Sequence, residues 1–249
     1  MKTTFTFLAC LVCAFARAQV DFAAPIMHAG IAAQTASVSV PAPYAWYKLD
    51  GNAIDSEGLN NGTLQGSPTF VSGLNGHQAI SLSGTNQYVS LGTMWPGMST
   101  NTNCAVSAWV YNTNLPSNTG SFLQEQYIYS FGQGAQVGIQ ADSVGAEWGS
   151  EFQASGGYPE VKSAFNYINN NWHFICGEYN GQTLILGVDG TYYSMAETQI
   201  PNANPSLGGA IGEYPGTGLY WHGEIQDVRI WTNSLTEAQM TAVYQAGAQ

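Results

Sequence analysis

Two stretches of the chain place carboxylates at spacings that could serve acid–base chemistry: "EWGSE" contains Glu147 and Glu151, and "GEIQD" contains Glu224 and Asp227. Pairs of carboxylates about 5 to 9.5 Å apart carry out most glycoside hydrolysis, one as acid and the other as nucleophile or base. Glu147 and Glu151 would face the same side only of an extended strand, and the glycine between them weakens a strand. Most carboxylates of this kind are simply solvated. A divergent glycan hydrolase or lyase that uses this pair is therefore an alternative hypothesis and not the leading one.

Aromatic residues in loop-like stretches indicate binding instead. Sugars stack their C–H faces on Trp and Tyr, while carboxylates and amides read their hydroxyl groups. Trp46, Trp109, Trp172 and Trp231 fall in strand patterns, so we expect them in the core. The aromatics that lie in Gly- or Pro-flanked stretches, and that we take as ligand-binding candidates, are Trp95, Trp148, Tyr158, Tyr214, Tyr220 and Trp221.

Strands must position these residues. From Tyr44 onward, short alternating or β-branched stretches such as "AISLS", "AVSAWVY", "WHFICGEY" and "TLILGV" recur about every ten residues. Turn signals such as "DG", "NNG" and "YNG" separate them. The pattern predicts an all-β, two-sheet antiparallel sandwich. One short C-terminal helix is predicted over "NSLTEAQMTAVY", with Ser234 and Glu237 as its capping box.

The N-terminus indicates export. Lys2, an apolar run from Phe5 to Phe15 and a small-residue pattern ending at Ala18 are typical of a cleavable secretory signal over residues 1–18. Residues 19–43 are Ala-rich and end in "VPAP", which predicts an extended linker or an added strand. Residues 44–249 form the predicted domain. No other apolar run approaches the roughly 18 residues needed to cross a bilayer, so we expect a secreted or cell-surface protein without membrane insertion.

The charge balance excludes nucleic acid as a partner. Cleavage after Ala18 would remove Lys2 and Arg17 and leave three basic side chains against 16 acidic ones. Such a chain repels polyanions. Only 8% of the residues are charged, which suits a β-rich domain with a sizeable core.

Five stretches together resemble a known family. "AWYKLDGNAIDSEGLNNGTL", "SGLNGHQAISLSGTNQYVSLG", "CAVSAWVYNT", "NNWHFICGEYNGQTLILGVDG" and "GEIQDVRIWTNSLTEAQMTAVY" occur in the order found in laminin G-like, concanavalin A-like lectin jelly-roll domains. Pentraxins are a more distant similarity. The resemblance covers residues 44 to 246 and implies a jelly roll whose last strand closes against the first.

Arg229 lies in that last strand. Strict alternation places Ile225, Asp227, Arg229 and Trp231 on one face of the strand. The guanidinium has five donors on an aliphatic stem, which suits bridging a carboxylate or loop carbonyls where the chain closes. We expect a structural role for Arg229.

The resemblance also implies a calcium ion. Related domains often hold Ca²⁺ through oxygens of the first "DGN" turn and the closing strand, which here correspond to Asp50, Asn52 and Asp227. Gln226 stands where the family more often has Asp, so one anionic ligand is missing and the affinity would fall. The alternative is that Asp50 and Asn52 cap a turn.

Cys104 and Cys176 belong to an exported chain, so a single disulfide is plausible. The pentraxin similarity suggests that Cys176 bonds across to the "AVSAW" strand. Cys104 lies about three residues before the position expected there, and an odd shift moves a side chain to the opposite sheet face. The Cys104–Cys176 bridge is nevertheless predicted.

The leading hypothesis is a secreted, non-catalytic, lectin-like domain that binds glycans or another extracellular surface ligand. The first alternative is a structural or adhesive protein that associates with itself or its neighbours through the N-terminal segment and its strand edges. The second is the divergent hydrolase or lyase.

Overall fold

The computed structural model describes residues 38–93, 103–112, 125–132, 138–142, 147–164, 170–201 and 205–249. They belong to one compact unit that begins at Val38. The predicted signal peptide (1–18), residues 19–37 of the predicted linker, and Trp95 lie outside the described residues.

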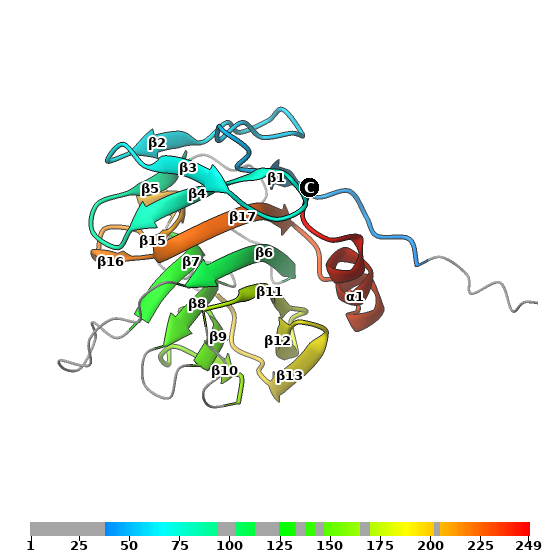
Figure 1. Ribbon diagram of the computed structural model, residues 1–249. Helices are drawn as coiled ribbons and strands as arrows, with labels where there is room; N and C mark the ends of the chain where they lie inside the picture. Colours follow the sequence, from blue (N-terminus) through cyan, green and yellow to red (C-terminus); the bar gives the residue numbers. More distant parts are fainter. Residues whose placement is uncertain are drawn as a thin grey trace, which may run out of the picture. The chain divides into compact units, whose positions relative to one another are not determined.

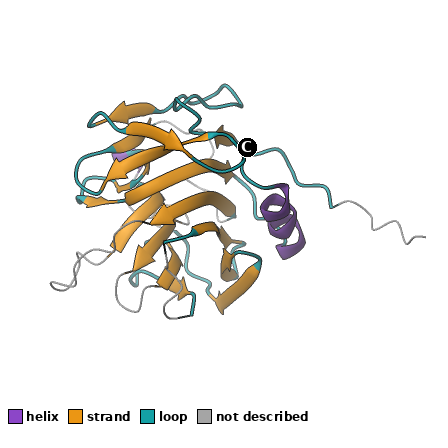
Figure 2. Cartoon of the chain, viewed as in Figure 1, coloured by secondary structure: helices purple, strands orange, loops and turns teal. Residues whose placement is uncertain are grey.

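Strands dominate this unit (Figures 1 and 2). One sheet, called sheet A, contains β1 (Ala45–Tyr47), β3 (Thr69–Ser72), β4 (Gln78–Ser83), β6 (Cys104–Asn112), β11 (Trp172–Tyr179), β12 (Thr183–Val188), β13 (Thr191–Ala196) and β17 (His222–Trp231). Its order is β13-β12-β11-β6-β17-β4-β3, and β1 pairs with β17. The closing strand therefore lies beside the first strand, as predicted.

The second sheet, called sheet B, contains β2 (Thr63–Gln65), β5 (Tyr88–Gly92), β7 (Glu125–Phe131), β8 (Gly138–Asp142), β9 (Glu147–Glu151), β10 (Glu160–Lys162) and β14 (Gly209–Ile211). Its order is β10-β9-β8-β7-β14-β5-β2. A separate hairpin pairs β15 (Glu213–Tyr214) with β16 (Leu219–Tyr220). A 3-10 turn over Pro205–Leu207 precedes β14. The prediction of a two-sheet antiparallel jelly-roll sandwich is confirmed.

The core lies between the two sheets because alternate side chains of each strand point inward. In β6, Val106, Ala108 and Val110 belong to this core, whereas Ala105 faces outward. Sheet B contributes Ile128, Ile139 and Phe152, among others, to the same cluster. Each sheet therefore has an inner face that supports the fold and an outer face that is available for other contacts.

The outer face of sheet A carries the only α-helix of the described residues, α1 (Glu237–Ala246) (Figure 1). Met240 and Val243 of α1 pack with Phe174 and Trp231. The predicted helix is confirmed, but its capping box is formed by Thr236 and Gln239. No helix of the described residues is long and apolar enough to cross a membrane.

The last strand contains an irregularity that changes its faces. The register of β17 against β6 shifts between Gln226 and Arg229. Ile225 therefore joins Val228 and Ile230 in the inter-sheet core, while Trp231 packs under α1. The prediction that Ile225 shares a face with Arg229 and Trp231 is wrong, because the shift breaks the alternation.

Arg229 has the structural role that we expected. Its Nε and Nη2 each donate to one oxygen of Asp227 at 2.9 Å, and its guanidinium lies 4.5 Å from the ring centre of Trp46 on β1. Trp46 is directly opposite Arg229 in the β1–β17 pairing. The contact between Arg229 and Trp46 therefore helps to hold the closing strand, β17, against the first strand, β1.

The end of the predicted linker is held against the same region. The carbonyl of Pro41 accepts a hydrogen bond from Trp231 Nε1 at 2.9 Å, and that of Ser39 accepts one from Gln239 Nε2 at 3.0 Å. Val40 packs against the cluster under α1. Residues 38–43 contain no strand pairing of their own.

The predicted disulfide is not formed, since neither Cys104 nor Cys176 is part of a disulfide, and both are buried. In the β6–β11 pairing, Cys104 lies opposite Tyr179 and Cys176 lies opposite Ser107. Cys104 points into the inter-sheet core, whereas Cys176 points outward under α1. The odd offset therefore separates the two sulfur atoms by the thickness of the sheet, and this prediction is wrong.

We expect both thiols to be inert in the folded protein. Burial raises the pKa of the Cys176 thiol, and a thiol that stays protonated and inaccessible reacts slowly. A disulfide-exchange reagent should modify neither cysteine of the chain without residues 1–18 in native buffer, and both in guanidinium. A reductant should leave the melting temperature unchanged. A cysteine count of zero in guanidinium without reductant would show that the bridge exists.

Candidate functional site

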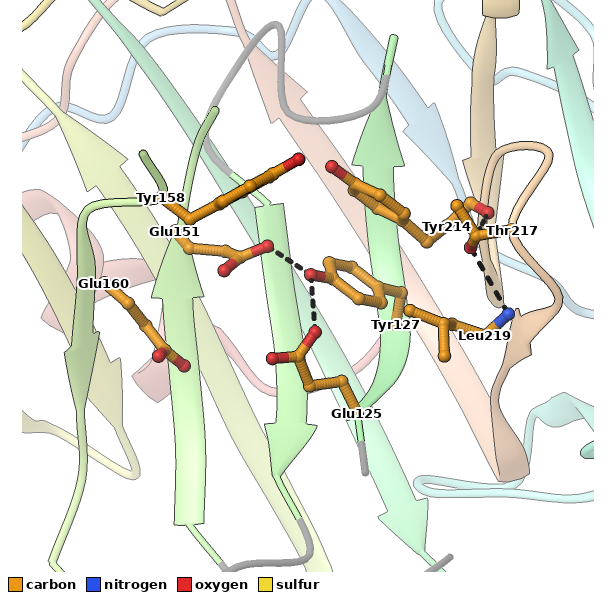
Figure 3. A pocket seen from close by; sticks show the side chains of 8 residues that line it. All are labelled: Glu125, Tyr127, Glu151, Tyr158, Glu160, Tyr214, Thr217 and Leu219. Atoms are coloured by element: carbon orange, nitrogen blue, oxygen red, sulfur yellow. Dashed lines mark hydrogen bonds between the residues drawn. The ribbon is translucent and has the colours of Figure 1, made fainter. Parts of the chain in front are cut away.

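A pocket of about 350 Å³ opens on the outer face of sheet B, beside the β15–β16 hairpin (Figure 3). Its volume is at the lower end of the range for small-molecule sites. It is lined by Glu125, Tyr127, Glu151, Tyr158, Glu160, Tyr214, Thr217 and Leu219. Carboxylates and phenol rings therefore make up most of the lining.

Strand β7 provides the floor of the pocket. The register of β7 against β8 shifts between Tyr127 and Tyr129. This irregularity sends Tyr129 into the inter-sheet core and leaves Tyr127 in the pocket. In an undisturbed strand, residues two positions apart share a face, so Tyr127 and Tyr129 would point the same way. The bulge therefore creates the aromatic floor.

Strands β9 and β10 provide two of the carboxylates. Along β9, Trp148 points into the core and Glu151 points into the pocket. Glu151 is directly opposite Glu160 in the β9–β10 pairing. Side chains at such positions start about 5 Å apart. Two glutamates are therefore held next to each other by backbone pairing alone.

The β15–β16 hairpin provides one wall. Gly212 precedes it with a φ of +84°, which favours glycine, and an added Cβ there would strike Leu82. The ring of Tyr214 packs on the ring of Tyr127 with centroids 4.4 Å apart. The hydroxyl of Thr217 donates to the Tyr214 carbonyl at 2.8 Å and so closes the turn. The hairpin thus presents an aromatic ring to the strand floor.

Tyr158 lies at the rim and is 56% exposed. Its hydroxyl and that of Tyr214 point toward one another (Figure 3). Tyr214 itself is only 6% exposed. A ligand can therefore reach the face of Tyr158 directly, and the hydroxyl of Tyr214 from inside the pocket.

One tyrosine hydroxyl joins two carboxyl groups. The hydroxyl of Tyr127 is hydrogen-bonded to Glu151 and, at 3.1 Å, to Glu125. The Tyr127 hydroxyl is the donor in both contacts, so its single hydrogen is shared between the two carboxyl groups. Burial raises the pKa of Glu151 to about 8, the hydrogen bond from Tyr127 opposes the rise, and the charge of Glu125 adds to it. Glu151 is therefore protonated at neutral pH.

Glu160 is in a different state. It accepts a hydrogen bond from Gln140 Nε2 at 2.8 Å and pairs with Lys162 at 3.2 Å. An adjacent cation and a hydrogen-bond donor both favour the charged form of a carboxyl group. The pocket therefore combines a protonated glutamate with a carboxylate that Lys162 balances.

The structure separates five of the six predicted ligand-binding aromatics into groups, and the sixth, Trp95, lies outside the described residues. Tyr158 and Tyr214 line the pocket. Tyr220 lies on the adjacent strand outside the lining and packs on Tyr88 with centroids 6.1 Å apart. Trp148 and Trp221 are fully buried in the core and stack on each other at 6.0 Å. Their prediction as surface residues is wrong, because the strands that carry them turn the indoles inward.

Sequence reasoning missed most of the polar lining, namely Glu125, Tyr127, Glu160 and Thr217. Glu125 and Tyr127 alternate in "EQYIYSF", but the same pattern would include Tyr129, which is in the core. The opposition of Glu151 and Glu160 depends on the conformation of the connection between β9 and β10, residues 152–159. No local signal in the sequence marks these four residues as neighbours.

The hydrolase hypothesis named Glu147 with Glu151. The extended strand that it requires is present, since β9 spans Glu147–Glu151. Only Glu151 lines the pocket. Glu147 lies opposite Asp142 at the other end of the strand. The carboxyl groups that accompany Glu151 come from β7 and β10 instead.

The residues implied as calcium ligands do not fit a calcium ion as they are arranged. Both oxygens of Asp227 are bound by Arg229, and Trp46 Nε1 also donates to Oδ1 at 2.5 Å. The oxygens of Asp50 bind His77 at 3.0 Å and the Gln78 amide at 2.8 Å. The Asn52 amide oxygen accepts the Ile54 N–H and caps the turn. A cation at Asp227 would have to displace the guanidinium.

A family model of the laminin G type, described as the concanavalin A-like lectin/glucanases superfamily, matches residues 83–241. The match includes β7, β9, β10 and the β15–β16 hairpin, and therefore every strand that lines the pocket. No curated protein matches the sequence.

Several solved structures share the fold. Domain 4 of AbnA, an extracellular GH43 arabinanase from Geobacillus stearothermophilus, solved with arabinotriose, has a TM-score of 0.64 and 18% identity over 85% of this chain and 100% of that chain. The botulinum neurotoxin serotype D binding domain has a TM-score of 0.61 and 15% identity over 83% of this chain and 52% of that chain. The binding domain of botulinum neurotoxin DC, solved with rat synaptotagmin II, has a TM-score of 0.59 and 12% identity over 81% of this chain and 50% of that chain. This chain thus spans about half the length of the two neurotoxin domains.

Proposed function

The chain belongs to the concanavalin A-like lectin/glucanases superfamily, and from that premise we propose that it is an extracellular carbohydrate-binding protein. Its binding site is the pocket between sheet B and the β15–β16 hairpin. The fold by itself hosts many functions, so the proposal depends on the residues of the site.

The observation that carries the proposal is the combination of an exposed ring and buried polar groups in one pocket. Tyr158 offers a phenol face that is 56% exposed, which suits stacking on the C–H face of a sugar. Glu151 and Glu160 provide the acceptors that read sugar hydroxyls. Thr217 and the hydroxyl of Tyr214 add further polar contacts at the hairpin wall.

Two further points support the proposal. The structurally similar domain 4 of the arabinanase was solved with arabinotriose, so this architecture can hold a short neutral oligosaccharide. The sequence begins with a predicted export signal over residues 1–18, and the first similar structure belongs to an extracellular enzyme. The neurotoxin domain solved with synaptotagmin shows that a relative of the same fold can instead bind a protein. Self-association through residues 19–43 stays a prediction.

We expect Tyr158→Ala to weaken oligosaccharide binding about tenfold, because it removes the accessible stacking face without touching the core. The measurement is calorimetric titration of residues 19–249 with arabinotriose and a panel of neutral tri- and tetrasaccharides. Leu59→Ala is the control, since Leu59 is an apolar residue that is 66% exposed and lies outside the pocket lining, so its loss should leave binding unchanged. Binding that survives Tyr158→Ala would place the site elsewhere.

A further inference from the structure

We propose that the pocket selects glycans that carry a free ammonium group, that is, amino sugars. This inference rests on the proposed function, because it names the class of sugar that the same pocket takes. It follows from the charges and the proton positions in the lining.

The described lining of the pocket contains three carboxyl groups and no basic residue. Three glutamates line it, and Lys162 pairs with one of them, Glu160. The two other basic residues beyond the predicted signal, Lys48 and Arg229, both lie over the ring of Trp46 on sheet A. A ligand with a positive charge would therefore complement the pocket better than a neutral or acidic one.

The position of the excess charge is defined by Tyr127. Its hydroxyl donates to both Glu125 and Glu151, which holds the two carboxyl groups around one phenol oxygen, and Glu151 carries a proton at neutral pH. An ammonium group brings three N–H donors and one positive charge. It can replace that proton, and both carboxyl groups then become charged acceptors. Charge-assisted hydrogen bonds of this kind are about twice as strong as neutral ones.

The hydroxyls of Tyr158 and Tyr214 add oxygen atoms at the wall of the pocket. The hydroxyl of Tyr214 is buried and hydrogen-bonded to that of Tyr158, and the two point toward one another (Figure 3). Tyr158 is 56% exposed, so its oxygen can accept an N–H from an ammonium group that enters the pocket.

The ionisable groups that face Glu151 fix the expected pH behaviour. They are Glu125 and Tyr127 on β7, Glu160 and Lys162 on β10, with Tyr158 and Tyr214 at the wall. Since the pKa of Glu151 is raised to about 8, this group is protonated at about pH 6. Binding of an ammonium group there should release a proton from Glu151, so the affinity should rise with pH in the acidic range, up to the pH at which the sugar ammonium group loses its own proton. Binding of a neutral sugar should release none.

The test uses two ligands that differ in charge. Residues 19–249 are titrated with a trimer of β-1,4-linked glucosamine and with its fully N-acetylated counterpart at about pH 6, in two buffers of different ionisation enthalpy. We expect the glucosamine trimer to bind about tenfold tighter or more, with proton release. Glu151→Gln should remove this preference and the proton release, while Glu57→Gln, the same change on an exposed turn, should leave both.

The outcomes separate this inference from the proposed function. Equal affinity for the two trimers, or a preference that persists in Glu151→Gln, would overturn the selection of amino sugars. If neither trimer binds but a neutral oligosaccharide does, the inference fails and the carbohydrate-binding function stands. If no oligosaccharide binds, the proposed function fails with it.

Discussion

Replacing Arg229 with alanine is expected to lower the free energy of unfolding by about 3 to 5 kcal/mol. The change leaves the carboxylate of Asp227 buried, at 3% exposure, without the cation that binds both of its oxygens. It also removes the guanidinium that covers Trp46. Guanidinium unfolding followed by tryptophan fluorescence measures the loss.

The structure of Asp227 explains why this position is sensitive. Asp227 has a φ of +55°, a left-handed conformation that is uncommon for residues other than glycine, and it lies within the register shift of β17. Its carboxylate also accepts the Trp46 indole N–H and the Gln249 amide. The carboxylate thus joins the first strand, the last strand and the C-terminus.

Two further variants separate charge from packing. In the double variant Arg229→Ala with Asp227→Asn, no uncompensated charge remains, so the loss should be smaller than in Arg229→Ala alone. Arg229→Lys should be intermediate because a single ammonium cannot bind both oxygens in the same geometry. A loss below about 1 kcal/mol for Arg229→Ala, the value of an exposed ion pair, would contradict a structural role.

Replacing Trp148 or Trp221 with alanine should cost about 3 to 5 kcal/mol of stability. Both indoles are fully buried and stack on each other, and Trp148 also lies 5.7 Å from the His173 ring. Alanine would leave a large cavity between the sheets. Thermal and guanidinium unfolding measure the effect, and any loss of ligand binding should follow the loss of folded protein.

Phenylalanine is the matched control at both positions. The indole N–H groups of Trp148 and Trp221 have no hydrogen-bond partner among the described residues. Trp→Phe therefore removes an unsatisfied polar group and keeps most of the packing, so we expect it to cost clearly less than alanine. If Trp221→Ala were as stable as the parent but bound no sugar, Trp221 would be a surface residue and its assignment to the core would be wrong.

The pocket shows how the fold creates a site from residues that are far apart in the sequence. Its floor depends on the irregularity of β7, its carboxylates on the pairing of β9 with β10, and its wall on the hairpin after Gly212. Each of these features is a departure from regular strand geometry or a choice of strand partner. Changes there should alter binding more than they alter the sandwich.

The sequence by itself determined the architecture of this protein. Short alternating stretches, turn residues and the final capped segment are local patterns, and each is imposed by the chemistry of neighbouring residues. They were sufficient to predict the two-sheet sandwich and the C-terminal helix. The resemblance of five ordered stretches added the family and the closing of the last strand against the first. The chemistry of Arg229 predicted a carboxylate or loop carbonyls as its partner, and the structure shows the carboxylate of Asp227.

Only the tertiary structure decided which side chains meet. One extra residue in a strand reverses the faces that follow it, so the irregularities in β7 and β17 moved Tyr127, Ile225 and Trp231 in ways that alternation cannot anticipate. The odd offset between Cys104 and Cys176 in the β6–β11 pairing likewise places them on opposite faces of sheet A. Trp148 and Tyr158 are each next to a glycine in the sequence, yet one fills the core and the other lines the pocket. Exposure and proximity depend on the pairing of distant strands, and that pairing has no local signature.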